Sequence, residues 1–199
     1  NTNSLFEELV SNEKTDFSRY NYFYASFAAA SKKIDKAKDI VNTALKSYPR
    51  NLLLNQYKLD LNQGNYISSF DCNNKGHVIA EILYITSNAL SSQSIYSLSN
   101  FYLNLAKYLN EEFHSYDTLL AENFYKIDSF EAAKKIYDNL GKKGKAFKWH
   151  ASKQLAKIYI QDENKDKALE LVSKAYNNLA NKDIYETFDY AEFLKNNEK

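Results

Sequence analysis

The sequence has 199 residues, of which 44% are hydrophobic and 26% are charged, so it can bury a core and is not compositionally disordered. Its formal net charge of +1 excludes the general attraction to phosphate that marks nucleic-acid-binding proteins, and no long apolar run predicts a membrane span. With 4 glycines and 1 proline, the chain is too poor in turn residues for an all-β protein, which favours helices.

The first part of the chain, residues 1–64, is expected to consist of N-terminal helices. Apolar residues recur there at spacings of three and four, with polar stretches between them. Pro49 ends one of these stretches, and Gly64 is placed to cap another. The predicted helices cover residues 3–11, 18–31, 35–48 and 51–63.

Residues 65–76 are rich in Asn, Ser and Gly and are expected to form an irregular loop. This loop is the predicted joint between the N-terminal part and residues 77–199. Helices are predicted beyond it at 77–91, 94–110, 114–127, 130–140, 145–161, 165–179 and 183–196.

The clearest pattern lies between Trp149 and Ala180, where two apolar stripes at helical spacing flank a polar turn. The turn is too short to cross a sheet, so the segment predicts an antiparallel helix hairpin. Each helix carries an alanine, Ala156 and Ala168, where a larger side chain would normally fill the core. These alanines would let the two helix backbones approach closely.

This hairpin resembles the tetratricopeptide repeat (TPR), whose signature is W-x₂-L-G-x₂-Y, then A-x₃-F, then P, over about 34 residues. It departs from that signature by Ala for Gly, by Val for Phe and by the absence of a final Pro. The matching residues are Leu155, Ala156, Tyr159, Ala168, Val172 and Ala175.

The same pattern recurs along the chain at nearly the same period, which is the stronger indication of a repeat protein. One period earlier the matching residues are Leu120, Ala121, Phe124, Ala133, Tyr137 and Leu140. A weaker unit before that one contains Ser87, Leu90, Ser99, Leu103 and Ala106. Near the N-terminus they are Tyr24, Ala25, Ala28, Ala37, Val41, Ala44 and Pro49.

The resemblance implies an all-α fold, a right-handed superhelix (α-solenoid) of antiparallel helix pairs. Its TPR-like units would be 18–51, 80–113, 114–148 and 149–182, and 183–197 would be the first helix of a further unit. Because that last helix has no partner and the sequence does not begin with Met, we expect it to be a fragment of a longer array. Any targeting signal would have been lost with the missing N-terminus.

The 17 tyrosines and 12 phenylalanines fall mostly at expected core positions, such as Tyr84, Tyr108, Phe124, Tyr137 and Tyr159. In TPR proteins, partner peptides usually lie in the concave groove formed by the first helices. The resemblance therefore implies a groove at the second, fifth, ninth and twelfth positions of each unit. The predicted groove residues are Tyr22, Tyr84, Asn88, Glu122, Tyr125, His150, Lys153 and Lys157.

The predicted groove has mixed charge. Its Lys and Asn residues do not occur in the order across adjacent units that chaperone-binding TPR proteins use to hold a terminal carboxylate, so that function is rejected. Lys153 and Lys157, one helical turn apart, form the best contact for an acidic partner, although a solvated charged face is the more ordinary explanation for them.

No catalytic motif is present. The GKKG turn at 141–144 lacks the spacing of a phosphate-binding loop, and the three histidines form no metal-binding pattern. We therefore expect no enzymatic activity, no cofactor and no metal.

The predicted function is that of a non-catalytic scaffold that binds a protein or peptide in its groove. Within the repeat family, the resemblance is to bacterial TPR proteins, and the Lys- and Asn-rich, Arg-poor composition suggests an AT-rich genome. The alternatives are an accessory repeat region of a larger enzyme and a cell-envelope assembly factor. A cytoplasmic location is the default expectation, and the oligomeric state is left open.

Overall fold

The computed structural model describes residues 2–11, 18–179 and 182–197, and these residues form eleven α-helices and no strand. The predicted all-α class is therefore confirmed. The chain divides into two compact units, 1–68 and 69–199. The limits of the individual repeats stay a prediction.

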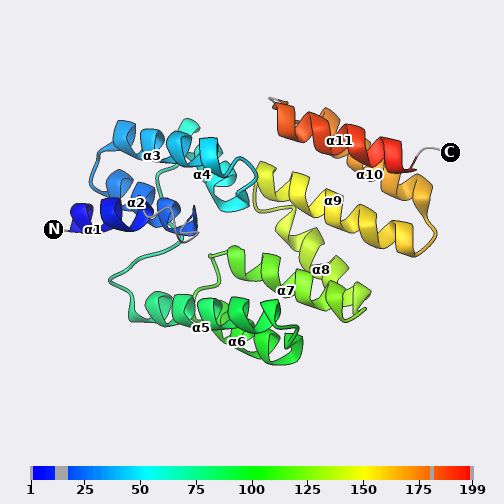
Figure 1. Ribbon diagram of the computed structural model, residues 1–199, viewed down its shortest axis with the longest axis horizontal. Helices are drawn as coiled ribbons and strands as arrows, with labels where there is room; N and C mark the ends of the chain where they lie inside the picture. The colour runs from blue at the N-terminus through cyan, green and yellow to red at the C-terminus, as the bar shows by residue number, and fades with distance from the viewer. Residues whose placement is uncertain (1, 12–17, 180–181, 198–199) are drawn as a thin grey trace. The chain divides into compact units, whose positions relative to one another are not determined.

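The first unit contains four helices, coloured blue to cyan in Figure 1. The most extensive contacts in this unit join α2 to α3, and α4 packs against both of them. The helices are α1 (Thr2–Val10), α2 (Ser18–Ala30), α3 (Ile34–Ser47) and α4 (Leu52–Asn62).

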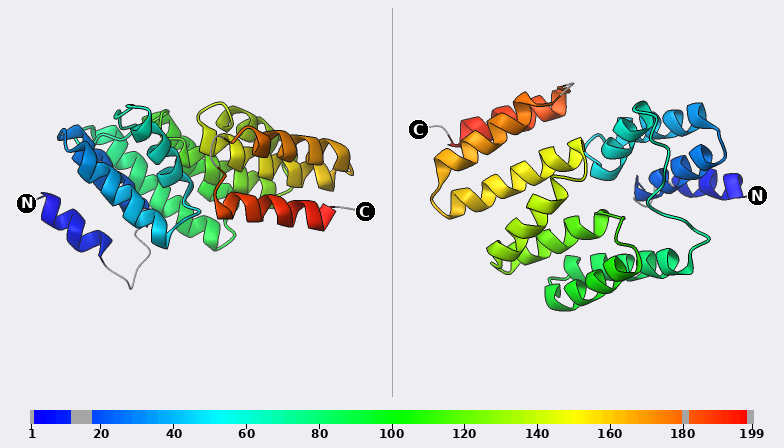
Figure 2. Two further views of the ribbon diagram at one scale, coloured as in Figure 1. Left: turned by 90° about the horizontal axis from the view of Figure 1, so that it is seen from above. Right: turned by 180° about the vertical axis from the view of Figure 1, so that it is seen from behind.

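The second unit contains seven helices, and successive helices lie side by side in the three views of Figures 1 and 2. The most extensive contacts join α5 to α6, α7 to α8 and α9 to α10. The helices are α5 (Lys75–Ser92), α6 (Tyr96–Leu109), α7 (Ser115–Lys126), α8 (Phe130–Leu140), α9 (Lys145–Gln161), α10 (Lys165–Asn177) and α11 (Ile184–Asn197).

Four helix pairs, α2–α3, α5–α6, α7–α8 and α9–α10, are each connected by a turn of the same geometry. In each, a residue with left-handed backbone geometry follows the first helix, with φ between 57° and 63°, and the next N–H bonds to a carbonyl five residues back. This geometry satisfies carbonyl groups at the end of the helix. The left-handed residues are Lys32, Ser94, Asp128 and Glu163, and the last three lie 34 and 35 residues apart.

The small residues that define the repeat pattern are buried, as predicted. All eight have 0% of their surface exposed, and in the α5–α6 pair the Ser99 hydroxyl donates to the Ser87 carbonyl at 2.8 Å. A side chain larger than serine would hold these helices further apart. The eight residues are Ala25, Ala37, Ser87, Ser99, Ala121, Ala133, Ala156 and Ala168.

Ala168→Leu is expected to destabilise the protein by about 1–3 kcal/mol, because added methylene groups at a closed helix contact force off-rotamer side chains and backbone shifts. Ala168 lies in a core with Trp149, Ala156 and Val172. A urea melt measures the loss. Lys174→Leu, at an exposed position of the same helix, is the matched control. An unchanged midpoint for Ala168→Leu would contradict the close contact.

The prediction that Tyr108 belongs to the core is wrong. Tyr108 is 81% exposed, whereas Leu103 and Ala106 on the same helix are fully buried. Tyr108 lies five residues after Leu103, about 140° around the helix, so it points away from the buried stripe.

Residues 63–74 contain no helix, as the composition predicts, but the end of this loop is fixed to the second unit. Phe70 packs on Phe113 with ring centroids 5.9 Å apart, and the Asn110 amide donates to the Ser69 carbonyl at 3.0 Å. Asn74 caps α5 by accepting from the Gly76 N–H at 2.9 Å.

Candidate functional site

The predicted groove residues fall in separate places. Tyr22, in the first unit, is buried with its ring 4.9 Å from that of Tyr57, so it belongs to the core there. On α5, Tyr84 is half-buried against Tyr116 at 5.6 Å, and Asn88 is exposed. The remaining five lie on α7 and α9.

Three of these five lie around one buried side chain: Glu122 and Tyr125 on α7, and His150 on α9. The charge of Lys157 on α9 acts on Glu122 and on His150. These four residues are called here the α7–α9 surface. Beneath them lies Tyr137 of α8, whose ring is 6.1 Å from that of His150. Burial raises the pKa of the Tyr137 hydroxyl, and the charge of Glu122 and the hydroxyl of Tyr125 raise it further.

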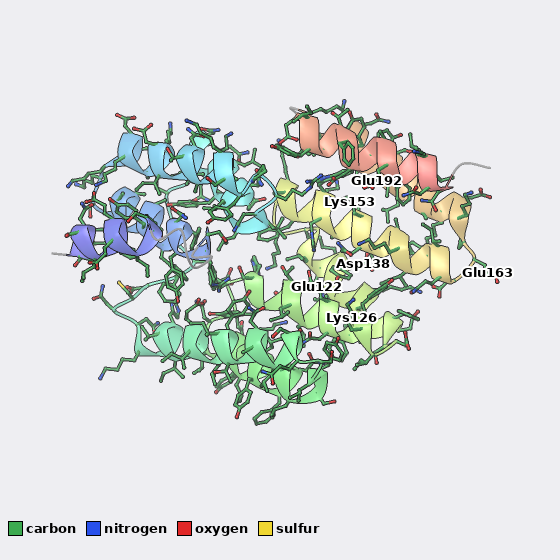
Figure 3. All side chains as sticks on the ribbon, viewed as in Figure 1. Glu122, Lys126, Asp138, Lys153, Glu163 and Glu192 are labelled. Carbon is green, nitrogen blue, oxygen red and sulfur yellow. The ribbon has the colours of Figure 1, made fainter. Side chains whose placement is uncertain are left out.

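Glu122 lies on α7 in Figure 3, near the middle of the second unit. Burial raises the pKa of its carboxyl, while the charges of Lys157 and Lys126 partly oppose that rise. The two lysines are exposed and Glu122 is half-buried. Lys157 of the α7–α9 surface and the neighbouring Lys126 therefore place two positive charges near a recessed carboxylate.

His150 is a half-buried member of this surface. Burial lowers the pKa of its imidazole to about 4, and the nearby Lys153 and Lys157 contribute to the decrease. Within the described residues, its buried Nε2 has no hydrogen-bond partner. The neutral ring therefore packs against Tyr137 at pH 7.

Lys153 has a role that the sequence analysis did not assign. Its ammonium group lies 2.5 Å from the Asp189 carboxylate of α11 and 5.1 Å from the Trp149 ring centroid. Figure 3 shows Lys153 on the side of α9 that faces α11. Lys153 thus joins two helices, whereas Lys157 is exposed and its charge acts on Glu122.

Lys153→Glu is expected to weaken the attachment of α11 by about 1–3 kcal/mol, because it replaces a half-buried ion pair by two like charges. The side chains of Lys153 and Asp189 are only 26% and 16% exposed. Hydrogen exchange of the α11 amides measures the loss. Lys153→Glu combined with Asp189→Lys should restore much of the protection, and normal protection in Lys153→Glu alone would contradict the contact.

A surface hollow of about 670 Å³ lies elsewhere in the second unit, and it contains none of the predicted groove residues. In it, Lys107 pairs with Asp117, whose Oδ2 lies 3.6 Å from His114 Nδ1. Burial acts to raise the pKa of Asp117, but its interactions with His114 and Lys107 outweigh burial and keep the pKa below its usual value. Lys107 and Asp117 thus form an ion pair with each other in this hollow.

Sequence reasoning also missed a buried polar network at Asn123 on α7. The Asn123 amide donates to Ser99 Oγ and to Asn100 Oδ1, both at 2.8 Å, and its carbonyl accepts from Ser91 Oγ at 2.6 Å. The network joins α7 to both α5 and α6. The period gave no signal for this contact, because Ser91 and Asn123 lie 32 residues apart, whereas the turns recur after 34 and 35 residues.

No three His, Cys, Asp or Glu side chains in the described part of the chain gather into a metal-binding group. None of the helices described is long and apolar enough to cross a membrane.

No family model matches the sequence, and none of the curated proteins compared matches it. Among solved structures, the chain is similar to a thermophilic TPR protein in Thermus thermophilus, at 16% identity and a TM-score of 0.46, over 97% of this chain and 89% of that one. That likeness is too distant to transfer the role of any residue. Within the chain itself, the four similar turns and the eight buried small residues show TPR-like helix pairs in both units.

Proposed function

We propose that the protein is a non-catalytic scaffold that binds another protein or a peptide on the α7–α9 surface. The observation that carries the proposal is the convergence of Glu122, Tyr125 and His150 around the buried Tyr137, with the charge of Lys157 acting on Glu122 and His150. Two helices of successive pairs supply these side chains, so the surface has a rigid base. A rigid base limits the entropy lost on binding.

The chemistry of this surface favours a partner segment that carries a carboxylate. Lys126 and Lys157 are exposed, and the one carboxylate between them, Glu122, is partly buried and has a raised pKa. Tyr125, half-buried with its ring 5.6 Å from that of Phe130, supplies an aromatic face with few rotatable bonds. An acidic side chain next to an apolar one would match this arrangement.

Photo-crosslinking tests the location. A benzophenone amino acid in place of Tyr125 is expected to crosslink one partner, and the crosslinked peptides should map to a single acidic segment. The same substitution at Tyr185 on α11, a similarly placed aromatic outside the α7–α9 surface, is the matched control. Efficient crosslinking at Tyr185 but not at Tyr125 would refute the proposed site.

Lys157→Glu is expected to weaken binding of the crosslinked partner at least tenfold, on the order of 1.4 kcal/mol. It should leave the melting temperature almost unchanged, because exposed charges contribute little to stability. Titration of the labelled partner segment measures the affinity. Lys174→Glu, an exposed lysine on α10, should bind normally. Equal affinities for the two variants would show that Lys157 does not contact the partner.

A further inference from the structure

The surface hollow of the second unit has the size of a small-molecule site. Its volume of about 670 Å³ falls within the roughly 300–1,000 Å³ of such sites. The hollow lies where α6 ends, where α7 begins and where α8 passes into the turn before α9. Its walls are fixed, because buried side chains such as Leu103 and Tyr137 anchor α6 and α8 in the core.

Two lysines of this hollow have their charge available for a ligand. Lys142 and Lys143, in the turn after α8, are exposed, and neither forms an ion pair with another of the described residues. The third lysine, Lys107, is neutralised by Asp117. One further carboxylate, the exposed Glu111, lines the hollow, so its cations outnumber its carboxylates.

The same hollow offers an aromatic ring to a ligand. Tyr108 is 81% exposed and lines it, and the half-buried Ile136 of α8 adds apolar surface. An exposed ring of this kind can stack on a flat ring of a ligand, as aromatic side chains do with nucleic-acid bases.

The ring and the available cations come from different segments of the chain. Tyr108 and Glu111 belong to the end of α6 and the connection to α7, whereas Lys142 and Lys143 follow α8. A ligand that uses both segments needs an anionic group for the lysines and a flat ring for the tyrosine. Hydroxyl groups suit Glu111, because a carboxylate accepts hydrogen bonds, as acidic residues do from ribose in nucleotide-binding proteins.

We propose that this hollow binds a mononucleotide. Lys142 and Lys143 hold its phosphate, Tyr108 stacks on its base, and Glu111 accepts hydrogen bonds from its ribose hydroxyls. A phosphate monoester carries about 1.5 to 2 negative charges at pH 7, which the two lysines balance. Lysine side chains bind phosphate as point charges. The turn at 141–144 can therefore serve without the backbone cradle of a phosphate-binding loop.

Other anions use this set of side chains less completely. Inorganic phosphate would leave Tyr108 and Glu111 without a role. A nucleic-acid strand needs cations along several successive phosphates, whereas the available lysines of the hollow are two neighbouring residues and the whole chain has a formal net charge of only +1.

The test is calorimetric titration of the 199-residue chain with AMP, GMP, CMP and UMP, and separately with inorganic phosphate and with adenosine. At least one of the four nucleotides is expected to bind roughly tenfold more tightly than inorganic phosphate, and AMP more tightly than adenosine. Lys142→Gln combined with Lys143→Gln should weaken nucleotide binding at least tenfold, on the order of 1.4 kcal/mol.

Tyr108→Ala separates the ring from the phosphate. It should weaken nucleotide binding roughly fivefold or more and leave the affinity for inorganic phosphate unchanged. Phe101→Ala is the matched control, because Phe101 is 57% exposed on the same helix and does not line the hollow. For the lysines, the control is Lys135→Gln combined with Lys148→Gln, two exposed lysines outside the hollow. Both control proteins should bind normally.

Several results would overturn the proposal. They are the absence of binding by all four nucleotides at millimolar concentration, equal affinity for nucleotides and inorganic phosphate, and normal nucleotide binding by the double variant of Lys142 and Lys143. An equal loss of affinity in the control proteins would also overturn it, by showing that the nucleotide binds outside the hollow. None of these measurements involves the α7–α9 surface, so they leave the function proposed for that surface untouched.

Discussion

Acidification from pH 7 to pH 4 is expected to remove about 3 kcal/mol of stability through His150 alone. Burial lowers the folded-state pKa of this imidazole to about 4, from an ordinary value of 6.5. Protonation therefore favours the unfolded chain. The stabilisation is complete above pH 6.5 and is lost as the pH falls from 6.5 through 4.

His150→Phe is the variant that isolates this effect, since phenylalanine keeps an aromatic ring against Tyr137 without a titratable nitrogen. Urea melts at several pH values should show a much smaller acid loss for the variant than for the wild type. Glu122 acts in the opposite direction, because burial raises its pKa and its protonation at low pH favours the folded state. The difference between the two proteins cancels that contribution. Parallel stability curves for wild type and variant would show that His150 is solvated.

The fold follows from the sequence to a large extent because helix pairs of this kind are a local structure. Three- and four-residue apolar spacing predicts each helix, and the ends observed differ from those predicted by no more than two residues. Ala156 and Ala168 are buried where the repeat pattern placed them. Their small size signals close packing before any tertiary contact is known.

The geometry of the turns between paired helices could not be predicted from the apolar spacing of the sequence. Four non-glycine residues adopt left-handed geometry between paired helices, among them Asp128 and Glu163. The usual sequence signal at such positions is glycine, and these turns lack it. The hydrogen bonds around each turn and the packing of the two helices impose the geometry instead.

Part of the candidate site could be predicted from the sequence, because the repeat period indicates which positions of successive helices are neighbours. Glu122 and Lys157 occupy equivalent positions of successive first helices, so a repeat array brings them together. The role of Lys153 was not predicted. Residue spacing indicates on which side of a helix a side chain lies, but it does not indicate which residue of another helix that side chain contacts. Asp189, 36 residues further on, pairs with Lys153, and this ion pair attaches α11 to α9.

Asn123→Leu is expected to destabilise the second unit by on the order of 3 kcal/mol, because it removes three hydrogen bonds from a buried network. Asn123 is 1% exposed, and leucine has a similar size, so packing changes little. The loss comes from Asn100 Oδ1 and the Ser91 hydroxyl, which are left without their partner. Urea unfolding measures it, and Asn88→Leu, at an exposed position of α5, is the matched control.

A double variant distinguishes this network from simple packing. When Asn100→Leu is added to Asn123→Leu, the unsatisfied Asn100 oxygen disappears together with its former partner. The double variant is therefore expected to be more stable than the sum of the two single losses predicts, by about 1 kcal/mol or more. Additive losses would mean that the two asparagines act independently, and that α7 is held to α5 and α6 by apolar contacts alone.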